Sequence, residues 1–233
     1  MNALAGGGSF ATMPTLIALG LPSTVANATS NVAVQPGAMA SAWAYRAGLA
    51  PIGGVGIRPL AAVTFCGGLI GSLLLVWTPA RAFDVIVPWL LLAATVAIAL
   101  GRHAADWVAS RFRAGPRAVV AGQALLGIYG GYFGGGVGMM LTAMWGVLTG
   151  THPATLAAPR TLMLAVANSA ATAIFVLSGI IAWSLCLPMM IGSIAGGYCG
   201  ARLGRVLPPA VIRGWTLLIT ATTTAVFFWR AYG

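Results

Sequence analysis

The stretch GIYGGYFGGGVGMM, residues 127–140, decides the fold, because it places seven glycines in fourteen positions inside an otherwise apolar segment. Glycine in a helix interior is less favourable than alanine by about 1 kcal/mol per residue. A continuous helix through this stretch is therefore disfavoured, and the sequence predicts a backbone break between two helical pieces. The composition of the rest of the chain indicates whether that break lies in a water-soluble protein or in a membrane.

The chain is too apolar for a water-soluble fold. It has 233 residues, of which 59% are hydrophobic and 6% charged, whereas soluble domains carry about 25% charged residues. Apolar runs of about 17–25 residues, the length that crosses a bilayer as a helix, recur along it. We predict an all-α integral membrane protein with about seven or eight membrane segments. They cover residues 9–20, 24–46, 59–78, 85–101, 118–133 with 137–149, 155–182, 184–203 and 210–230.

Charge and cysteine content exclude several function classes. The net charge of +10 comes from twelve arginines against two aspartates. The arginines lie at the ends of apolar runs, where positive charges set membrane topology, so we expect no nucleic-acid partner. The three cysteines lie in apolar runs without paired spacing and are interpreted as small hydrophobes. With two histidines and no glutamate, we expect no metal site, no cofactor, no catalytic residues and no enzymatic activity.

The two halves of the chain resemble each other. AGGGSFATMPTLIALGLPSTVANATS at 5–30 and FGGGVGMMLTAMWGVLTGTHPATLAAPRT at 133–161 share a triple glycine, an apolar stretch and a proline followed by small residues and threonine. CGGLIGSLLL at 66–75 matches AGGYCGARLG at 195–204. We therefore predict two repeats, each with a glycine-rich broken or re-entrant helix, as many secondary transporters have. Their bounds are 1–100 and 118–233, with a cytoplasmic connector over 101–117.

The break in the second repeat lies within residues 118–149, a segment too long for one straight crossing and too short for two. A hairpin of two half-helices that meet at Gly134–Gly138 fits this length. The half-helix that begins there would direct unpaired N–H groups and a positive dipole end at the break, which suits an anion. A kinked helix, whose glycines only allow close helix packing, is the alternative.

Arginine positions favour the hairpin. Positive charges collect on the cytoplasmic side of a membrane, where we place the connector. If residues 118–149 cross once, the arginines outside are Arg81, Arg160, Arg202, Arg205 and Arg213. If this segment returns to its own side, only Arg81 and Arg230 lie outside. The returning segment also makes the two repeats inverted copies of each other.

Two long segments carry a family resemblance. AGGGSFATMPTLIALGLPSTVANATSNVAVQPGAMASAWAYRAG at 5–48 and NSAATAIFVLSGIIAWSLCLPMMIGSIAGGYCGARLGRVLPP at 168–209 resemble the sulfite exporter TauE/SafE family. The resemblance covers nearly the whole chain. It implies a permease for small sulfur-containing anions such as sulfite, sulfoacetate or thiosulfate in a bacterial inner membrane.

The chain departs from that family in two places. Related sequences commonly carry a lysine where this chain has Asn31, while the matching segment of the second half keeps a basic residue, Arg160. Members usually have a further helical stretch before the first triple glycine, where this chain has only MNALA. By internal symmetry we expect the first repeat to lack its N-terminal half-helix, which an upstream segment or a neighbouring subunit would supply.

The candidate substrate-binding residues surround the two glycine breaks. A charge deep in a bilayer is costly, so Arg160 needs a partner or a water-filled cavity, and an anionic substrate would serve as its counter-ion. The alternatives are that Arg160 extends to the interface and that the polar side chains form helix–helix hydrogen bonds. The predicted set is Gly6, Gly7, Gly8, Ser9, Asn27, Thr29, Ser30, Asn31, Gly134, Gly135, Gly136, Arg160, Thr161, Asn168 and Ser169, with Gln35 beside them.

These features together predict a secondary transporter that moves a small sulfur oxyanion or organosulfonate across the membrane. A passive anion channel of the same architecture shares every feature and stays open as the alternative. The expected partners are the small anionic substrate and the lipid bilayer, with a homodimer possible. Gly192, Gly196, Gly200 and Gly204 recur every fourth residue and are interpreted as a face for close helix contact.

Overall fold

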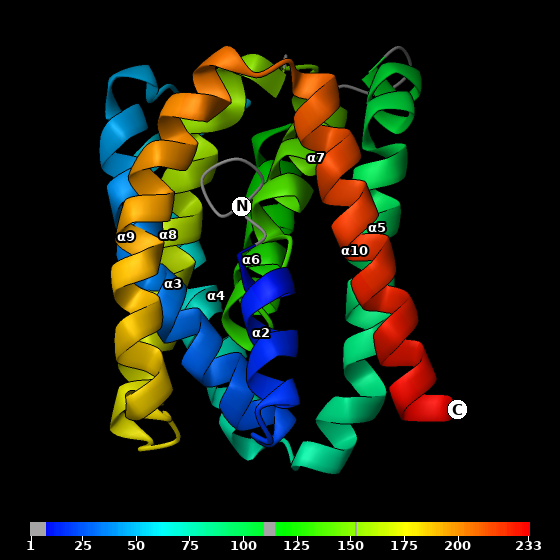
Figure 1. The fold of residues 1–233 in the computed structure, drawn as a ribbon. Helices are drawn as coiled ribbons and strands as arrows, with labels where there is room; N and C mark the ends of the chain where they lie inside the picture. The colour runs from blue at the N-terminus through cyan, green and yellow to red at the C-terminus, as the bar shows by residue number, and fades with distance from the viewer. Residues whose placement is uncertain (1–7, 110–114, 152) are drawn as a thin grey trace.

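A computed structural model describes residues 8–109, 115–151 and 153–233 of the chain. The described residues form a helical bundle (Figure 1). Most helices begin and end within a few residues of the expected segments, although α5 extends beyond its expected end and α8 stops short of it. The helices are α2 (Ser9–Ala18), α3 (Ser23–Tyr45), α4 (Ile57–Trp77), α5 (Ala80–Ala109), α6 (Pro116–Tyr132), α7 (Val137–Thr149), α8 (Ala157–Leu177), α9 (Trp183–Val206) and α10 (Pro209–Tyr232), with short 3₁₀ turns at Arg46–Gly48 and Pro153–Leu156.

Four of these helices are long and apolar enough to cross a membrane: Ile57–Trp77, Ala80–Leu100, Ala157–Leu177 and Ala210–Tyr232. They correspond to α4, to most of α5, to α8 and to α10. The helices α2 and α7 are apolar but shorter. Helices of this length and composition indicate a membrane protein.

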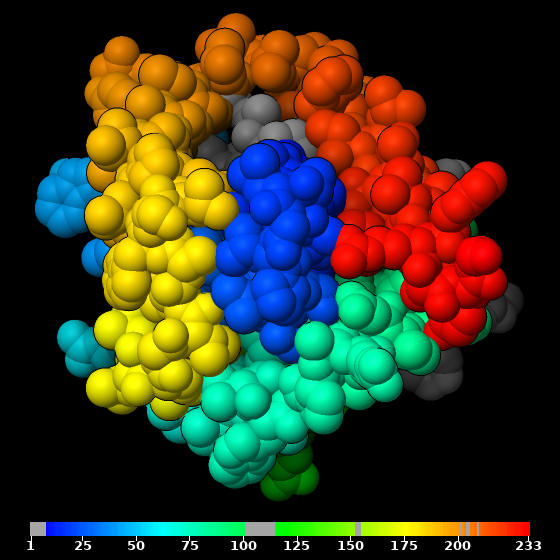
Figure 2. Space-filling view, turned by 60° about the horizontal axis from the view of Figure 1, so that its bottom comes forward, coloured from blue at the N-terminus to red at the C-terminus, as the bar shows by residue number. Residues whose placement is uncertain are grey.

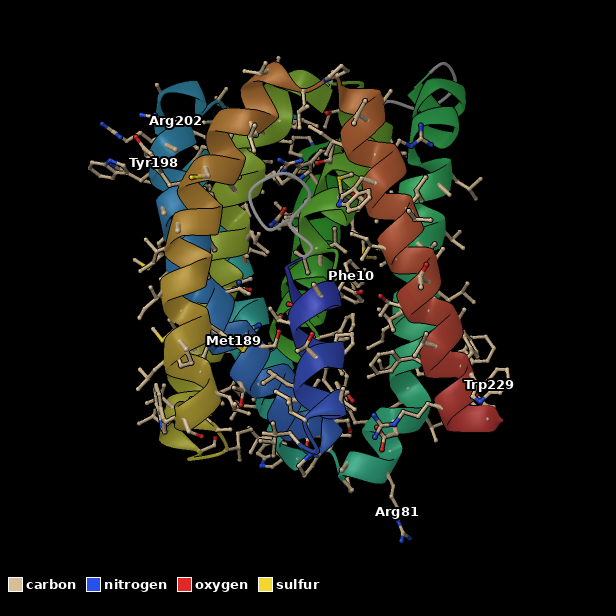
Figure 3. The ribbon with its side chains drawn as sticks, in the orientation of Figure 1. Phe10, Arg81, Met189, Tyr198, Arg202 and Trp229 are labelled. Atoms are coloured by element: carbon tan, nitrogen blue, oxygen red, sulfur yellow. The ribbon has the colours of Figure 1, made fainter. Side chains whose placement is uncertain are left out.

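The two ends of the bundle carry different chain segments. At one end, which we call the loop end, residues 49–56 approach the first residue of α6 and the last residue of α7: a Cβ built on Gly53 would lie 2.7 Å from Thr149 Cγ2, and one on Gly54 would lie 3.8 Å from Pro116 Cγ. The opposite end, which we call the Arg81 end, holds the junction of α4 with α5. Figure 3 shows Arg202 and Arg81 at these two ends.

The helices α3 and α8 lie in the interior and contact each other. The amide of Gln35 in α3 donates to the carbonyl oxygen of Ala165 in α8 at 3.2 Å. Figure 2 shows α2 at the surface of the Arg81 end, between α9, the start of α5 and α10. The apolar side chains of α2 that face inward, Phe10, Met13 and Leu16, are almost fully buried. A short helix is thereby held in the middle of the bundle.

Close contacts between the backbones of neighbouring helices depend on small residues, as is usual in membranes. A Cβ on Gly71 of α4 would lie 2.0 Å from the carbonyl oxygen of Ile128 in α6. A Cβ on Gly197 of α9 would lie 2.5 Å from the carbonyl oxygen of Gly37 in α3. The same helix pairs could not pack at this distance with larger residues.

The glycines that recur every fourth residue in α9 were predicted to form a face for close helix contact, and this prediction is wrong at Gly192 and Gly196. A Cβ built on Gly192 or on Gly196 would meet no atom within 4 Å among the described residues. The helix α9 instead packs through Gly197, which lies next to that stripe and faces α3. Spacing along a helix identifies a face of small residues, but it does not identify which neighbouring face the fold covers.

Candidate functional site

The glycine-rich stretch is a hairpin. The helix α6 ends at Tyr132 and α7 begins at Val137, and the far ends of both helices lie at the loop end. Between them, Gly134 and Gly136 both have a φ of +76°, a left-handed conformation that glycine adopts without steric cost. A Cβ on Gly136 would lie 3.1 Å from the Cβ of Ala94 in the middle of α5, so the break lies about halfway along the bundle.

A tyrosine holds the hairpin closed. The hydroxyl of Tyr129 donates to the carbonyl oxygen of Gly135 at 2.9 Å and lies 3.2 Å from the carbonyl oxygen of Leu90 in α5. The N–H groups of Phe133 and Gly134 both donate to the carbonyl oxygen of Tyr129. Tyr129 was not among the predicted site residues, although a tyrosine in an apolar helix is a signal in itself, because its buried hydroxyl needs a partner.

The first turns of α2 and α7 meet at the break. The ring of Phe10, the second residue of α2, would lie 2.9 Å from a Cβ on Gly136, and the hydroxyl oxygen of Ser9 would lie 3.9 Å from one on Gly134. The first N–H groups of any α-helix have no partner within the helix. From this meeting point α2 runs toward the Arg81 end and α7 toward the loop end (Figure 1). Two positive dipole ends therefore converge in the interior.

Polar side chains of α3 cover the same break. The Nδ2 of Asn27 donates to the carbonyl oxygen of Tyr132, the last residue of α6, at 3.0 Å. The Nδ2 of Asn31 would lie 2.9 Å from a Cβ on Gly134. The hydroxyls of Ser30 and Thr12 are hydrogen-bonded at 2.5 Å and so tie α3 to α2. The structure thus brings Ser9, Asn27, Ser30, Asn31 and Gly134–Gly136 together around one point.

Three amides of α3 form what we call the amide ladder: Asn27, Asn31 and Gln35, spaced four residues apart and therefore on one face of the helix. Their exposed fractions are 1%, 1% and 6%. The Nε2 of Gln35 donates to Ala165 and, at 2.6 Å, to the hydroxyl of Ser169. The side-chain oxygens of all three amides are buried without a hydrogen-bond partner among the described residues.

Other predicted site residues are engaged elsewhere. The hydroxyl of Thr29 accepts a hydrogen bond from the N–H of Ala182 at 3.0 Å, so it faces the start of α9. The hydroxyl of Thr161 bonds to carbonyl oxygens of its own helix. Asn168 is buried in the same helix. Gly8 precedes α2 and is buried, whereas Gly6 and Gly7 lie outside the described residues.

Arg160 lies in the first turn of α8 at the loop end, near Tyr45 of α3. Its side chain is half-buried and interacts with other groups of the chain. Asn168 follows it by eight residues, a rise of about 12 Å along a helix. Arg160 therefore lies closer to the loop end than Ser169, the residue of α8 that the amide ladder contacts.

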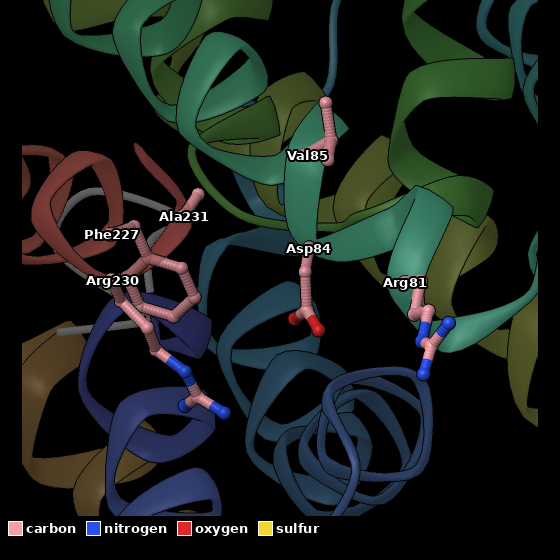
Figure 4. Close-up of a pocket in the computed structure, with 6 residues that line it drawn as sticks. All are labelled: Arg81, Asp84, Val85, Phe227, Arg230 and Ala231. Carbon is pink, nitrogen blue, oxygen red and sulfur yellow. The ribbon is translucent and has the colours of Figure 1, made fainter. Parts of the chain in front are cut away.

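A separate cavity of about 210 Å³ opens at the Arg81 end (Figure 4). It lies between the start of α5 and the end of α10 and is lined by Arg81, Asp84, Val85, Phe227, Arg230 and Ala231. In Figure 4 the carboxylate of Asp84 lies between the two guanidinium groups. Two arginines that are far apart in the sequence therefore share the end opposite to Arg160 and Arg202.

Comparisons with known proteins agree with the membrane architecture. A probable membrane transporter protein of Haemophilus influenzae is 27% identical over 228 residues, which cover 97% of this chain and 88% of that protein. The probable membrane transporter protein YfcA of Escherichia coli (strain K12) is 26% identical over 235 residues, which cover 100% of this chain and 86% of that protein. No solved structure matches the chain.

The family model for the sulfite exporter TauE/SafE matches residues 1–227, nearly the whole chain. The helices long enough to cross a membrane and the relatives described as probable transporters point the same way. The chain is therefore a membrane transporter that belongs to the sulfite exporter TauE/SafE family.

Proposed function

We propose that the chain is a secondary transporter that moves a small sulfur oxyanion or organosulfonate, such as sulfite, sulfoacetate or thiosulfate, across the bacterial inner membrane. The observation that carries the proposal is the meeting of the first turns of α2 and α7 beside the Gly134–Gly136 break. Helix N-termini bind anions through free N–H groups and the helix dipole, and broken helices in secondary transporters use their N-termini in this way.

The packing supports inverted repeats over residues 1–100 and 118–233, in which α2–α5 correspond to α7–α10 and α6 is the half-helix that the first repeat is expected to lack. The helix α3 corresponds to α8, and α4 corresponds to α9. The helix α3 packs on α9 through Gly37 and Gly197, and α8 packs on α4 through Ala167 and Gly68, so the same pairing occurs twice. The helices α2 and α7 correspond to each other and run in opposite directions from the break (Figure 1). Under this proposal α6 and α7 form a re-entrant hairpin that enters from the cytoplasm.

The charges support this orientation. Arg46, Arg117, Arg160 and Arg213 belong to helix ends at the loop end, whereas Arg81 and Arg230 line the cavity at the other end. The loop end would then be cytoplasmic, because arginines collect on that side of a membrane. In this arrangement Arg160 attracts the anion from the cytoplasmic side, and the residues around the break hold it halfway across.

A ligand panel tests the proposed substrate class. We expect sulfite, thiosulfate or sulfoacetate to raise the melting temperature of the purified chain in detergent, and sulfate and chloride to leave it unchanged. No shift with any sulfur anion would contradict the proposal. Proteoliposomes then separate the transporter from the passive channel: a coupled transporter accumulates the anion against its gradient, whereas a channel only equilibrates it.

A further inference from the structure

The amide ladder presents hydrogen-bond acceptors where the proposed substrate binds. The oxygens of Asn27, Asn31 and Gln35 are buried and have no partner among the described residues. Folded proteins pair the large majority of buried polar atoms. Three unpaired acceptors on one face of one helix therefore indicate a partner with hydrogen-bond donors that the described residues do not supply.

The orientation of two of these amides is fixed by their partners. The nitrogen of Asn27 donates to the carbonyl oxygen of Tyr132, and the nitrogen of Gln35 donates to that of Ala165. A flipped amide would place its oxygen against a carbonyl oxygen, where two acceptors repel each other. The unpaired atoms of Asn27 and Gln35 are therefore oxygens, and they accept hydrogen bonds without being able to donate.

A fully deprotonated oxyanion cannot satisfy these oxygens, because it also offers only acceptors. The helix rise of about 12 Å between Asn27 and Gln35 exceeds the reach of one small ligand, so a bound anion meets only the ladder oxygens beside the break, those of Asn27 and Asn31. An anion that carries an O–H or N–H group fits this part of the site. Its charged oxygens accept from the first turns of α2 and α7, while its hydrogen faces one of these two oxygens.

We propose, on the basis of the proposed function, that the bound substrate donates a hydrogen bond to the amide ladder. The site would then prefer singly protonated oxyanions, or sulfonates with a hydroxyl or amine group, over ions of the same size and charge that lack a donor. Hydrogensulfite would cross the membrane with its proton attached, and no bond would form or break. The chain has no glutamate and two aspartates, Asp84 and Asp106, so a proton carried by the substrate needs no carboxylate relay.

A matched pair of ligands tests this preference in the full chain reconstituted into proteoliposomes. The ions 2-hydroxyethanesulfonate and 1-propanesulfonate have the same charge and nearly the same size, and differ by a hydroxyl in place of a methyl group. We expect 2-hydroxyethanesulfonate to inhibit the uptake of radioactive sulfite at a concentration at least about tenfold lower. The Asn31→Leu variant should lose most of this difference, because it removes one ladder oxygen. The Ser41→Ala variant is the control, since the Ser41 hydroxyl bonds to Gly37 and Gly197 on another face of α3.

The possible results separate this inference from the proposed function. Equal inhibition by the two sulfonates, with normal sulfite uptake, would overturn the ladder preference and assign the unpaired oxygens to bound water. An absence of saturable sulfite uptake in the wild-type chain would overturn the proposed function, and the inference with it. A tenfold preference that Asn31→Leu abolishes and Ser41→Ala preserves would support both.

Discussion

The Nδ2 of Asn31 lies 2.9 Å from the position that a Cβ would take on Gly134. Two segments that are distant in the sequence, the middle of α3 and the turn between α6 and α7, are thereby in direct contact. The φ of Gly134 is +76°, so this residue combines a left-handed backbone with a closely packed neighbour. The relationship links the shape of the break to the polar residues of the candidate site.

Gly134→Ala tests this contact. A left-handed alanine costs about 1–2 kcal/mol, and the new methyl group would also displace Asn31. The control is Gly179→Ala, because Gly179 has a φ of +68° and no atom of the described residues lies within 4 Å of its Cβ position. We expect Gly134→Ala to lower the melting temperature in detergent by clearly more than Gly179→Ala does. Equal losses would contradict the contact with Asn31.

The packing of α4 on α6 gives a second prediction. A Cβ on Gly71 would lie 2.0 Å from the carbonyl oxygen of Ile128, and overpacking of this kind costs about 1–3 kcal/mol or more. Gly71→Ala should therefore lower the melting temperature strongly. Gly196→Ala in α9 places a methyl group where no atom of the described residues lies within 4 Å and should be neutral or stabilising by up to about 1 kcal/mol. Similar losses in both variants would contradict the described helix packing.

Arg160 gives a third prediction. If its charge attracts the substrate, Arg160→Gln should reduce sulfite uptake by proteoliposomes at least about tenfold, and Arg160→Lys should restore part of it. Arg202 is the control, because it lies at the same end, exposed, with its guanidinium over the ring of Tyr198. Arg202→Gln should leave uptake unchanged. Normal uptake by the Arg160→Gln variant would contradict a role of Arg160 in attracting the substrate and would favour the alternative that its side chain extends to the membrane interface.

The orientation of the chain gives a fourth prediction. Arg230 lies at the end of α10 and shares a cavity with Arg81, so a cysteine appended after Gly233 should react with an impermeant maleimide added from the periplasm. The background needs Cys66→Ser and Cys199→Ser, because both cysteines are exposed. Labelling that occurs only after the membrane is opened would contradict the proposed topology.

The sequence predicted the helices and the break well because both follow from local composition. Apolar runs of the right length predict helices that cross a bilayer, and a cluster of glycines predicts an interruption wherever it occurs. The interruption appears at Gly134–Gly136, within the expected stretch. Asn27 and Asn31 were predicted as substrate-binding residues of the first repeat, and the structure places both beside the break of the second.

Contacts between helices could not be predicted from the same patterns. Thr29 was expected beside Asn31, but it bonds to Ala182, because residues two apart on a helix point in different directions. Gly192 and Gly196 were expected to pack closely, whereas Gly197 does so. The rotation of each helix about its axis depends on all of its neighbours, and a single sequence carries little information on it.

The break between α6 and α7 is proposed to be part of a site that carries sulfur anions. Uptake of radioactive sulfite by proteoliposomes, compared between the wild-type chain, Gly134→Ala and Gly179→Ala, tests this claim directly. We predict saturable uptake in the wild type and in Gly179→Ala, and a loss of at least about tenfold in Gly134→Ala, whose methyl group displaces Asn31. Unchanged uptake in a folded Gly134→Ala variant, or no saturable uptake in the wild type, would contradict it.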